Sequence, residues 1–221
     1  MKKIILIAAV AVSSLTASAQ SKFKAGTWSI QPKVGVTITS VTNMDNVNIA
    51  TYVPASKVDN QVNVGATIGG EVEYQIDNRF SVAAGLGYIM QGKQWDDYAV
   101  AGISVKDTKL ELGYINVPIV ANFYVFKGLA VKAGMQFAFM TNAKFKSTAK
   151  EGNVETDQSV DIMDACNKFD FSIPVGVSYE FDNHIVIDAR YNIGITNVNK
   201  DGNINCKNSV FLATVGYKFK L

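Results

Sequence analysis

The sequence predicts an all-β protein: an eight-stranded antiparallel up-and-down β-barrel that crosses a membrane. Three observations predict it. Long segments alternate apolar with small or polar residues, their connections alternate between short and long, and the N-terminus carries an export signal. Side chains on a strand point alternately to its two faces, so each such segment has one apolar face. Tilted strands of about 9–11 residues span a bilayer core, whereas globular strands are commonly about 5–6 residues long.

The first 19 residues have the pattern of a signal peptide. The basic pair Lys2-Lys3 precedes the apolar run Ile4–Val12, and Ala17-Ser18-Ala19 fits a cleavage site. That run is too short to span as a helix, and no cysteine for a lipid anchor lies at the cleavage point. We therefore expect a signal peptide over 1–19 and an outer-membrane β-barrel domain over 20–221.

Composition agrees with an exported membrane barrel. Removing the two lysines of the signal from the 21 basic residues leaves 19 basic against 19 acidic residues. This balance gives no general attraction to nucleic acid. Hydrophobic residues make up 48% of the chain but are dispersed by alternation, which is typical of transmembrane barrels. The expected location is the outer membrane of a Gram-negative-type cell, in contact with outer-membrane lipid.

The strands follow one another along the chain. In the central hairpin, residues 62–92, two alternating segments flank a tight turn at Asp77-Asn78. In the segment 109–125 the apolar phase changes near Gly113, which predicts a β-bulge there. The eight expected strands cover residues 28–39, 62–76, 80–91, 109–125, 129–139, 169–181, 185–195 and 211–221.

The connections alternate strictly in length. Short turns are expected at Asp77-Asn78, Lys127-Gly128 and Asp182-Asn183, and long loops over 40–61, 92–108, 141–168 and 197–207. Outer-membrane barrels have short periplasmic turns and long extracellular loops. An even number of strands then places both termini in the periplasm.

Charged residues fall on the face opposite the apolar band. Because an unpaired buried charge is costly, we expect these residues to pair across the barrel lumen. A structural plug of ion pairs is favoured over a gated conduction path. The expected lumen residues are Lys33, Glu71, Glu73, Glu111, Lys132, Asp170, Glu180, Asp188, Arg190 and Lys218.

Catalytic and metal-binding patterns are absent from the sequence. His184, the single histidine, lies at a predicted periplasmic turn, and neither an HExxH motif nor a phosphate-binding loop occurs. Neither Asp96-Asp97 nor the acidic group at 157, 161 and 164 has the order of a calcium loop. We therefore expect no enzymatic activity, no cofactor and no metal.

The loops hold two further features. Export favours a disulfide between Cys166 and Cys206, although the loops would have to lean together, and two unrelated thiols are the alternative. Loop aromatic residues are better explained by loop packing or the membrane interface than by a ligand surface; they are Tyr52, Trp95, Tyr98 and Phe145.

Several motifs resemble the PorT-like outer-membrane β-barrel family. They are Gly85-Leu86-Gly87-Tyr88 with Gln91-Gly92-Lys93, Tyr114-Ile115-Asn116-Val117-Pro118, and the stretch 190–197. Asn116 stands where the family pattern has Glu. The resemblance implies an eight-stranded outer-membrane barrel, and some members serve protein secretion. The C-terminal Gly216, Phe219 and Leu221 resemble the signal read by the barrel-insertion machinery, with Leu in place of the commoner final Phe.

The function expected is a structural or interaction role. Loops 92–108 and 141–168 would contact an unknown extracellular or periplasmic protein partner. Alternatives are a small porin-like channel, a secretion-associated component, an enzyme acting on lipid or peptide at the rim, and a soluble lipocalin-like barrel with its apolar face inside.

Overall fold

The computed structural model describes residues 21–42, 60–100, 103–151, 154–200 and 205–221. The expected signal peptide and Tyr52 lie outside the described residues. Among the described residues, no helix is long and apolar enough to cross a membrane.

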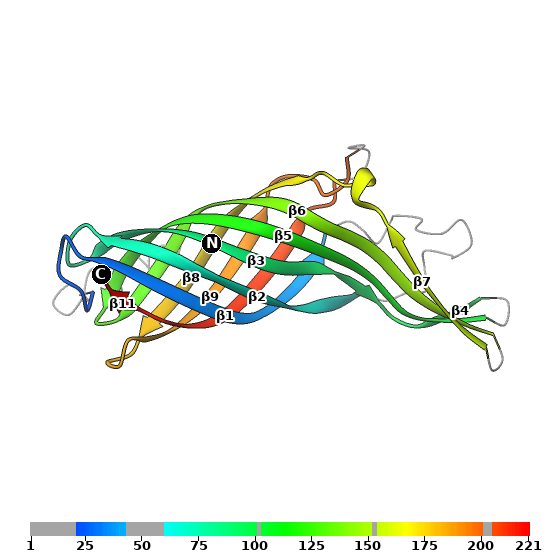
Figure 1. Ribbon diagram of the computed structural model, residues 1–221, viewed down its shortest axis with the longest axis horizontal. Helices are drawn as coiled ribbons and strands as arrows, with labels where there is room; N and C mark the ends of the chain where they lie inside the picture. Colours follow the sequence, from blue (N-terminus) through cyan, green and yellow to red (C-terminus); the bar gives the residue numbers. More distant parts are fainter. Residues whose placement is uncertain (1–20, 43–59, 101–102, 152–153, 201–204) are drawn as a thin grey trace, which may run out of the picture.

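Eight strands form a closed antiparallel barrel, which confirms the predicted fold class (Figure 1). They are paired in the order β5-β3-β2-β1-β10-β9-β8-β6, and pairing of β5 with β6 closes the ring. Their bounds are β1 (Trp28–Val41), β2 (Asn60–Gln75), β3 (Phe80–Trp95), β5 (Ile103–Phe126), β6 (Leu129–Glu151), β8 (Phe169–Glu180), β9 (Ile185–Gly194) and β10 (Asn208–Tyr217). The short β11 (Phe219–Lys220) follows β10 and also pairs with β1. Closure leaves the barrel without a free edge.

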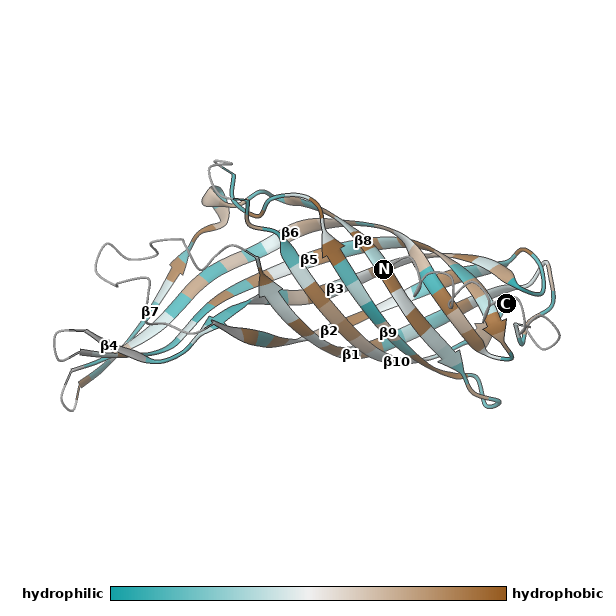
Figure 2. Cartoon of the chain, turned by 180° about the vertical axis from the view of Figure 1, so that it is seen from behind, coloured by the Kyte–Doolittle hydropathy of each residue, from teal (hydrophilic) through white to brown (hydrophobic). Residues whose placement is uncertain are grey.

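Apolar and polar residues alternate along the strands (Figure 2), and the apolar side chains are the exposed ones, on the outer face of the barrel. Val64 and Ile68 of β2 are 68% and 60% exposed, whereas Glu71 and Glu73 of the same strand are 3% and 6% exposed. An outward apolar band is unfavourable in water and is what a bilayer requires. The lipocalin-like alternative, with its apolar face inside, is therefore wrong.

Aromatic pairs border the apolar band near the turns. Trp28 packs on Tyr74 with ring centroids 4.8 Å apart, and Tyr217 packs on Phe219 at 4.6 Å. Such rings are common where a membrane protein meets the headgroup region.

Three tight turns and the two described chain ends lie at this same end of the barrel. The side chain of Asp77 accepts the backbone N–H groups two and three residues later, at 2.7 and 2.9 Å. The amide of Ser21 donates to the carbonyl of Asn78 at 2.7 Å, and that of Leu221 donates to Trp28 at 2.9 Å. The N-terminal segment and the C-terminus are thus both fixed at the turn end.

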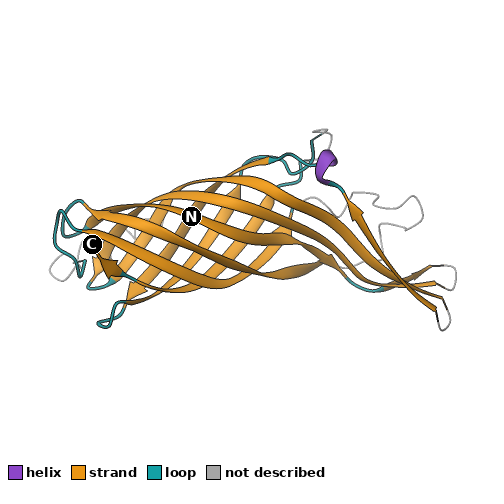
Figure 3. Cartoon of the chain, viewed as in Figure 1, coloured by secondary structure: helices purple, strands orange, loops and turns teal. Residues whose placement is uncertain are grey.

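Two regions expected to be long loops, 92–108 and 141–168, are largely strand (Figure 3). β3 continues to Trp95, β5 begins at Ile103 and β6 continues to Glu151. The short strands β4 (Tyr98–Val100) and β7 (Val154–Asp161) pair with β5 and β6, and the single-turn η2 (Met163–Ala165) follows. These segments form a four-stranded sheet, β4-β5-β6-β7, that extends past the barrel rim and is called the projecting sheet below (Figure 1). The loop prediction was wrong because polar strands, held by pairing, lack the apolar face that marks strands inside the membrane.

The structure has a bulge beside Gly113, as predicted, but the extra residue is in the paired strand β6 and not in β5. Gly113 pairs with Asn142 and Tyr114 with Met140, so Thr141 of β6 is the inserted residue. β5 therefore keeps a single phase, and the apolar residues that were expected to face lipid face the interior. They are Leu110, Leu112 and Tyr114, each at most 1% exposed.

Candidate functional site

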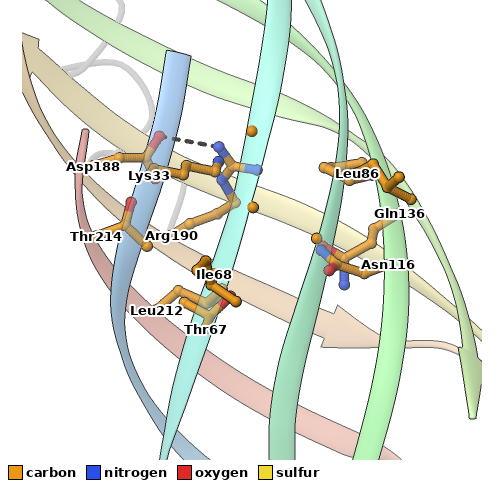
Figure 4. A pocket seen from close by; sticks show the side chains of 14 residues that line it. Lys33, Thr67, Ile68, Leu86, Asn116, Gln136, Asp188, Arg190, Leu212 and Thr214 are labelled. Carbon is orange, nitrogen blue, oxygen red and sulfur yellow. Dashed lines mark hydrogen bonds and ion pairs between the residues drawn. The ribbon is translucent and has the colours of Figure 1, made fainter. Parts of the chain in front are cut away.

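The middle of the barrel interior holds a network of buried charges from four strands. Arg190 of β9 lies at its centre, with Nη2 3.0 Å from Glu71 Oε1 and 3.0 Å from Asp188 Oδ2. Lys132 Nζ lies 2.5 Å from Asp188 Oδ2 and 3.7 Å from Glu71 Oε2, and Lys33 donates to Glu71. Figure 4 shows Lys33 of β1 converging on the same space as Asp188 and Arg190 of β9. Each carboxylate thus meets at least two cations.

A second charged layer lies toward the turn end. Lys218 Nζ is 2.9 Å from Glu73 Oε2 and 3.2 Å from Glu180 Oε2. Nδ1 of His184 lies 2.9 Å from Glu180 Oε1, and its ring stacks on Phe23 at 5.2 Å between centroids. The N-terminal segment therefore covers the turn end of the interior, and the sole histidine belongs to that closure.

The two layers together balance in charge. Next to them, a cavity of about 20 Å³ lies beside Arg190, close to the roughly 10–15 Å³ that one water requires. The layers contain four cations and four carboxylates, namely Lys33, Lys132, Arg190, Lys218, Glu71, Glu73, Glu180 and Asp188. Pairing on this scale offsets the cost of burying each charge.

Asp170, expected in the same set, lies apart from these layers. It is 3% exposed, and its Oδ1 accepts hydrogen bonds from Thr196 at 3.0 Å and Asn208 at 3.2 Å. Neutral side chains rather than a cation therefore hold this carboxyl.

Toward the projecting sheet the interior becomes apolar. This apolar layer was not predicted from the sequence. Two apolar residues on otherwise polar strand faces indicate it: Ile89 in the segment 80–91 and Leu212 in the last strand. The layer is a cluster of buried residues: Val41, Ile89, Trp95, Leu110, Leu112, Tyr114, Ala138, Met140, Ala143, Cys166, Val198, Cys206, Val210 and Leu212. A packed apolar layer across the lumen opposes passage of water and ions.

Glu111 is not a lumen residue, contrary to expectation. Because β5 keeps its phase through Gly113, Glu111 lies on the outer face, where it pairs with Lys146 at 2.7 Å and Lys109 at 3.1 Å. Its side chain is 25% exposed.

The disulfide expected between Cys166 and Cys206 does not form in the structure, where both thiols are free and buried. Asn199 forms a β-bridge with Cys166, while the amide of Val198 donates to the carbonyl of Cys206 at 2.7 Å. The segment around Val198 thus separates the cysteines by about two strand spacings, roughly 9–10 Å, beyond the reach of a disulfide. Burial raises the pKa of both thiols and keeps them protonated.

Residues 18–200 match the family described as outer membrane protein beta-barrel domain. The chain belongs to this family. The chain is also similar to several solved structures of outer-membrane proteins. Ail of Yersinia pestis is 15% identical, with 88% of this chain and 99% of that chain covered and a TM-score of 0.43. OprG of Pseudomonas aeruginosa is 13% identical, with 89% of this chain and 97% of that chain covered and a TM-score of 0.44. Neisserial surface protein A is 16% identical, with 87% of this chain and 97% of that chain covered and a TM-score of 0.41. No curated protein matches the chain.

The remaining predicted residues of this outer-membrane barrel lie at its two ends. The proposed insertion signal covers the end of β10 and β11, where Phe219 and Leu221 are 49% and 70% exposed and Gly216 is next to Pro32 of β1. At the other end, Trp95 packs on Phe145 with ring centroids 6.1 Å apart. Among the described residues, no group of three or more potential metal ligands occurs.

Proposed function

We propose that this outer-membrane barrel is a non-enzymatic interaction protein that presents the projecting sheet outside the cell, with both termini in the periplasm. The main support for this proposal is that the barrel interior is filled by side chains. A charge-balanced network and a packed apolar layer occupy the lumen, so the barrel is a support. The exposed polar surface lies beyond the rim, where every residue of β7 is exposed.

The projecting sheet has the chemistry of a contact surface for a polar partner. Lys150 pairs with Glu155 at 2.8 Å, Thr148 donates to Asp157 at 2.8 Å, and the apolar Val160 on the opposite face of β7 is 53% exposed. The Lys150 ammonium lowers the pKa of Glu155 by its hydrogen bond and its charge. A rigid sheet with both signs of charge suits a protein partner, because complementary charges give specificity.

Shortening the sheet tests this function. Residues 98–106 and 148–157 would each be replaced by Asn-Gly, since Asp97 and Asp107 are joined by a hydrogen bond and Ser147 lies opposite Gln158. We expect the barrel to fold and to keep its heat-dependent gel shift, while any surface or secretion phenotype of the deletion strain is no longer rescued. Full rescue by the shortened, folded barrel would contradict the proposal.

A secretion-associated role is the second candidate. It is supported by the PorT-like motif at 114–118, whose residues Tyr114 and Asn116 are buried inside the barrel. Secretion defects in the deletion strain that the shortened barrel still rescues would favour this role over surface contact.

A further inference from the structure

The small cavity beside Arg190 lies among the buried charges of the barrel lumen (Figure 4). Its volume of about 20 Å³ gives room for one water-sized occupant. Inward-facing side chains of four strands line it, among them Asn116, Gln136, Arg190 and Thr214. Each of these four is at most 7% exposed, so whatever occupies the cavity is held away from bulk water.

Three hydrogen-bond donors of these lining side chains have no partner in the described part of the chain. They are Arg190 Nε, Gln136 Nε2 and Thr214 Oγ1. A buried donor without an acceptor costs as much as its lost hydration, so three at one cavity indicate a bound acceptor. The fourth unpaired atom of the lining, Asn116 Oδ1, is itself an acceptor, which makes water the alternative occupant that a test must exclude.

Strand register brings the three donors to one part of the lumen. Asp188, Arg190 and Asn192 are successive inward positions of β9. Thr214 of β10 is paired directly with Asp188, and Gln136 of β6 accepts a hydrogen bond from Asn192 at 3.2 Å. Thr214 and Gln136 therefore lie on either side of Arg190 along the barrel axis, and all three donors face the same interior.

The layer of charges around Arg190 carries one more cation than carboxylate. It consists of Lys33, Lys132 and Arg190 against Glu71 and Asp188. The compensating negative charge lies in the other layer, toward the turn end, where Lys218 meets Glu73 and Glu180. Because charges interact strongly in a poorly solvated interior, the surplus beside the cavity attracts an anion.

We propose that this cavity binds one small monovalent anion of the size of chloride. The anion accepts hydrogen bonds from Arg190 Nε, Gln136 Nε2 and Thr214 Oγ1, and it neutralises the surplus cation of the central layer. Only the folded barrel brings these donors together, so the bound anion stabilises the folded state. The site lies inside the barrel and is independent of the proposed partner of the projecting sheet.

The dependence of unfolding on chloride tests the site. The barrel would be refolded in lipid vesicles in sodium chloride or, at equal ionic strength, in sodium gluconate, whose anion is too large for the cavity. Urea unfolding would then be followed by tryptophan fluorescence. Chloride at about ten times its dissociation constant should lower the ratio of unfolded to folded protein about tenfold, and gluconate should leave the ratio unchanged.

Two substitutions and a control assign the effect to the cavity. Thr214→Val removes one donor, keeps the shape of the side chain and should weaken the chloride effect. Asn116→Asp places a carboxylate at the cavity in the role of the anion and should remove the effect. The control Thr37→Val removes an inward hydroxyl of β1 that bonds the carbonyl of Met90 at 2.8 Å, and it should keep the chloride effect whatever its cost in stability.

Bromide locates the ion directly. Crystals of the barrel soaked in sodium bromide should show an anomalous diffraction peak in the lumen beside Arg190. Bromide peaks on the surface alone, as left by an adventitious ion only, would overturn the site. Equal unfolding in the two sodium salts, as expected of a cavity that holds only water, would do the same.

The variants provide a further way to reject the site. A chloride effect that is unchanged in Thr214→Val and in Asn116→Asp would place the ion elsewhere. Should Asn116→Asp fail to fold, Thr214→Val decides alone, because its hydroxyl has no partner to lose in the described part of the chain.

Discussion

Arg190 meets Glu71, 119 positions away in the chain, and Asp188, two positions away, each at 3.0 Å. Alternation alone places all three on the polar face, so their position inside the barrel could be predicted from the sequence. Their pairing could not, because it depends on how far neighbouring strands are shifted when the sheet closes. Glu111 was wrongly predicted to face the lumen, because a bulge assigned to its own strand reversed the face on which it was expected.

Removing the central cation tests the charged network. Arg190→Met should destabilise the barrel by about 3–5 kcal/mol, because Glu71 and Asp188 remain buried with fewer partners. The measurement is urea unfolding in lipid vesicles, followed by tryptophan fluorescence. Lys150→Met, which breaks an exposed pair on the projecting sheet, is the control and should change little. Equal small effects of both variants would contradict the network's role.

A pair of glycines tests the tightness of the interior. A Cβ on Gly85 would lie 2.7 Å from Glu71 Cγ and 2.8 Å from the carbonyl of Gly70, whereas one on Gly70 would meet nothing closer than 3.5 Å. Gly85→Ala should therefore cost about 1–3 kcal/mol through overpacking, and Gly70→Ala should cost little. The same unfolding experiment measures both, and the reverse order would show that the interior is loose at Gly85.

At the scale of elements, apolar alternation predicted the eight strands and the three tight turns, because bilayer contact requires it. It failed beyond the barrel rim, where β4, β7 and the ends of β5 and β6 are polar strands held by pairing. It also misplaced the bulge, since an inserted residue in β6 changes the phase of β6 and leaves β5 as it was. The residue pattern of one strand does not show whether an inserted residue lies in that strand or in the strand paired with it.

Deleting the inserted residue tests the bulge directly. Without Thr141, Met140 is followed at once by Asn142, just as their partners Tyr114 and Gly113 are adjacent, so the ladder pairs regularly and Phe145 keeps facing Trp95. In a Trp28→Phe background, which leaves Trp95 as the only tryptophan, its emission should therefore stay unchanged. Deleting the regularly paired Lys144 should instead turn Phe145 to the other face and shift the emission to longer wavelength. A shift in the Thr141 deletion as large as in the Lys144 deletion would contradict the assigned bulge.

At the scale of the whole molecule, the barrel has three interior layers between the turn end and the projecting sheet. The N-terminal segment covers the turn end, balanced ion pairs fill the middle, and apolar side chains close the other end. Sequence reasoning anticipated a polar plug but missed the apolar closure, because its residues come from separate strands and loops.

This layering predicts a barrel that does not conduct. Purified protein in planar bilayers should give no stable conductance steps. Leu112→Ser with Leu212→Ser, which makes the apolar layer polar, should give more frequent brief openings than the unaltered chain. Steady conductance by the unaltered protein would instead support the porin-like alternative.

We propose that the barrel lies in the outer membrane with the projecting sheet outside the cell. Single cysteines at Ser159 of β7 and at Asn78 of the first tight turn, in a Cys166→Ser, Cys206→Ser background, test it by reaction with a membrane-impermeant maleimide. We expect Ser159→Cys to be labelled in intact cells, and Asn78→Cys to be labelled only after the outer membrane is opened. Labelling of Asn78→Cys alone in intact cells would show that the barrel is inserted in the opposite orientation, with the tight turns outside. Labelling of neither would place the sheet away from the cell surface.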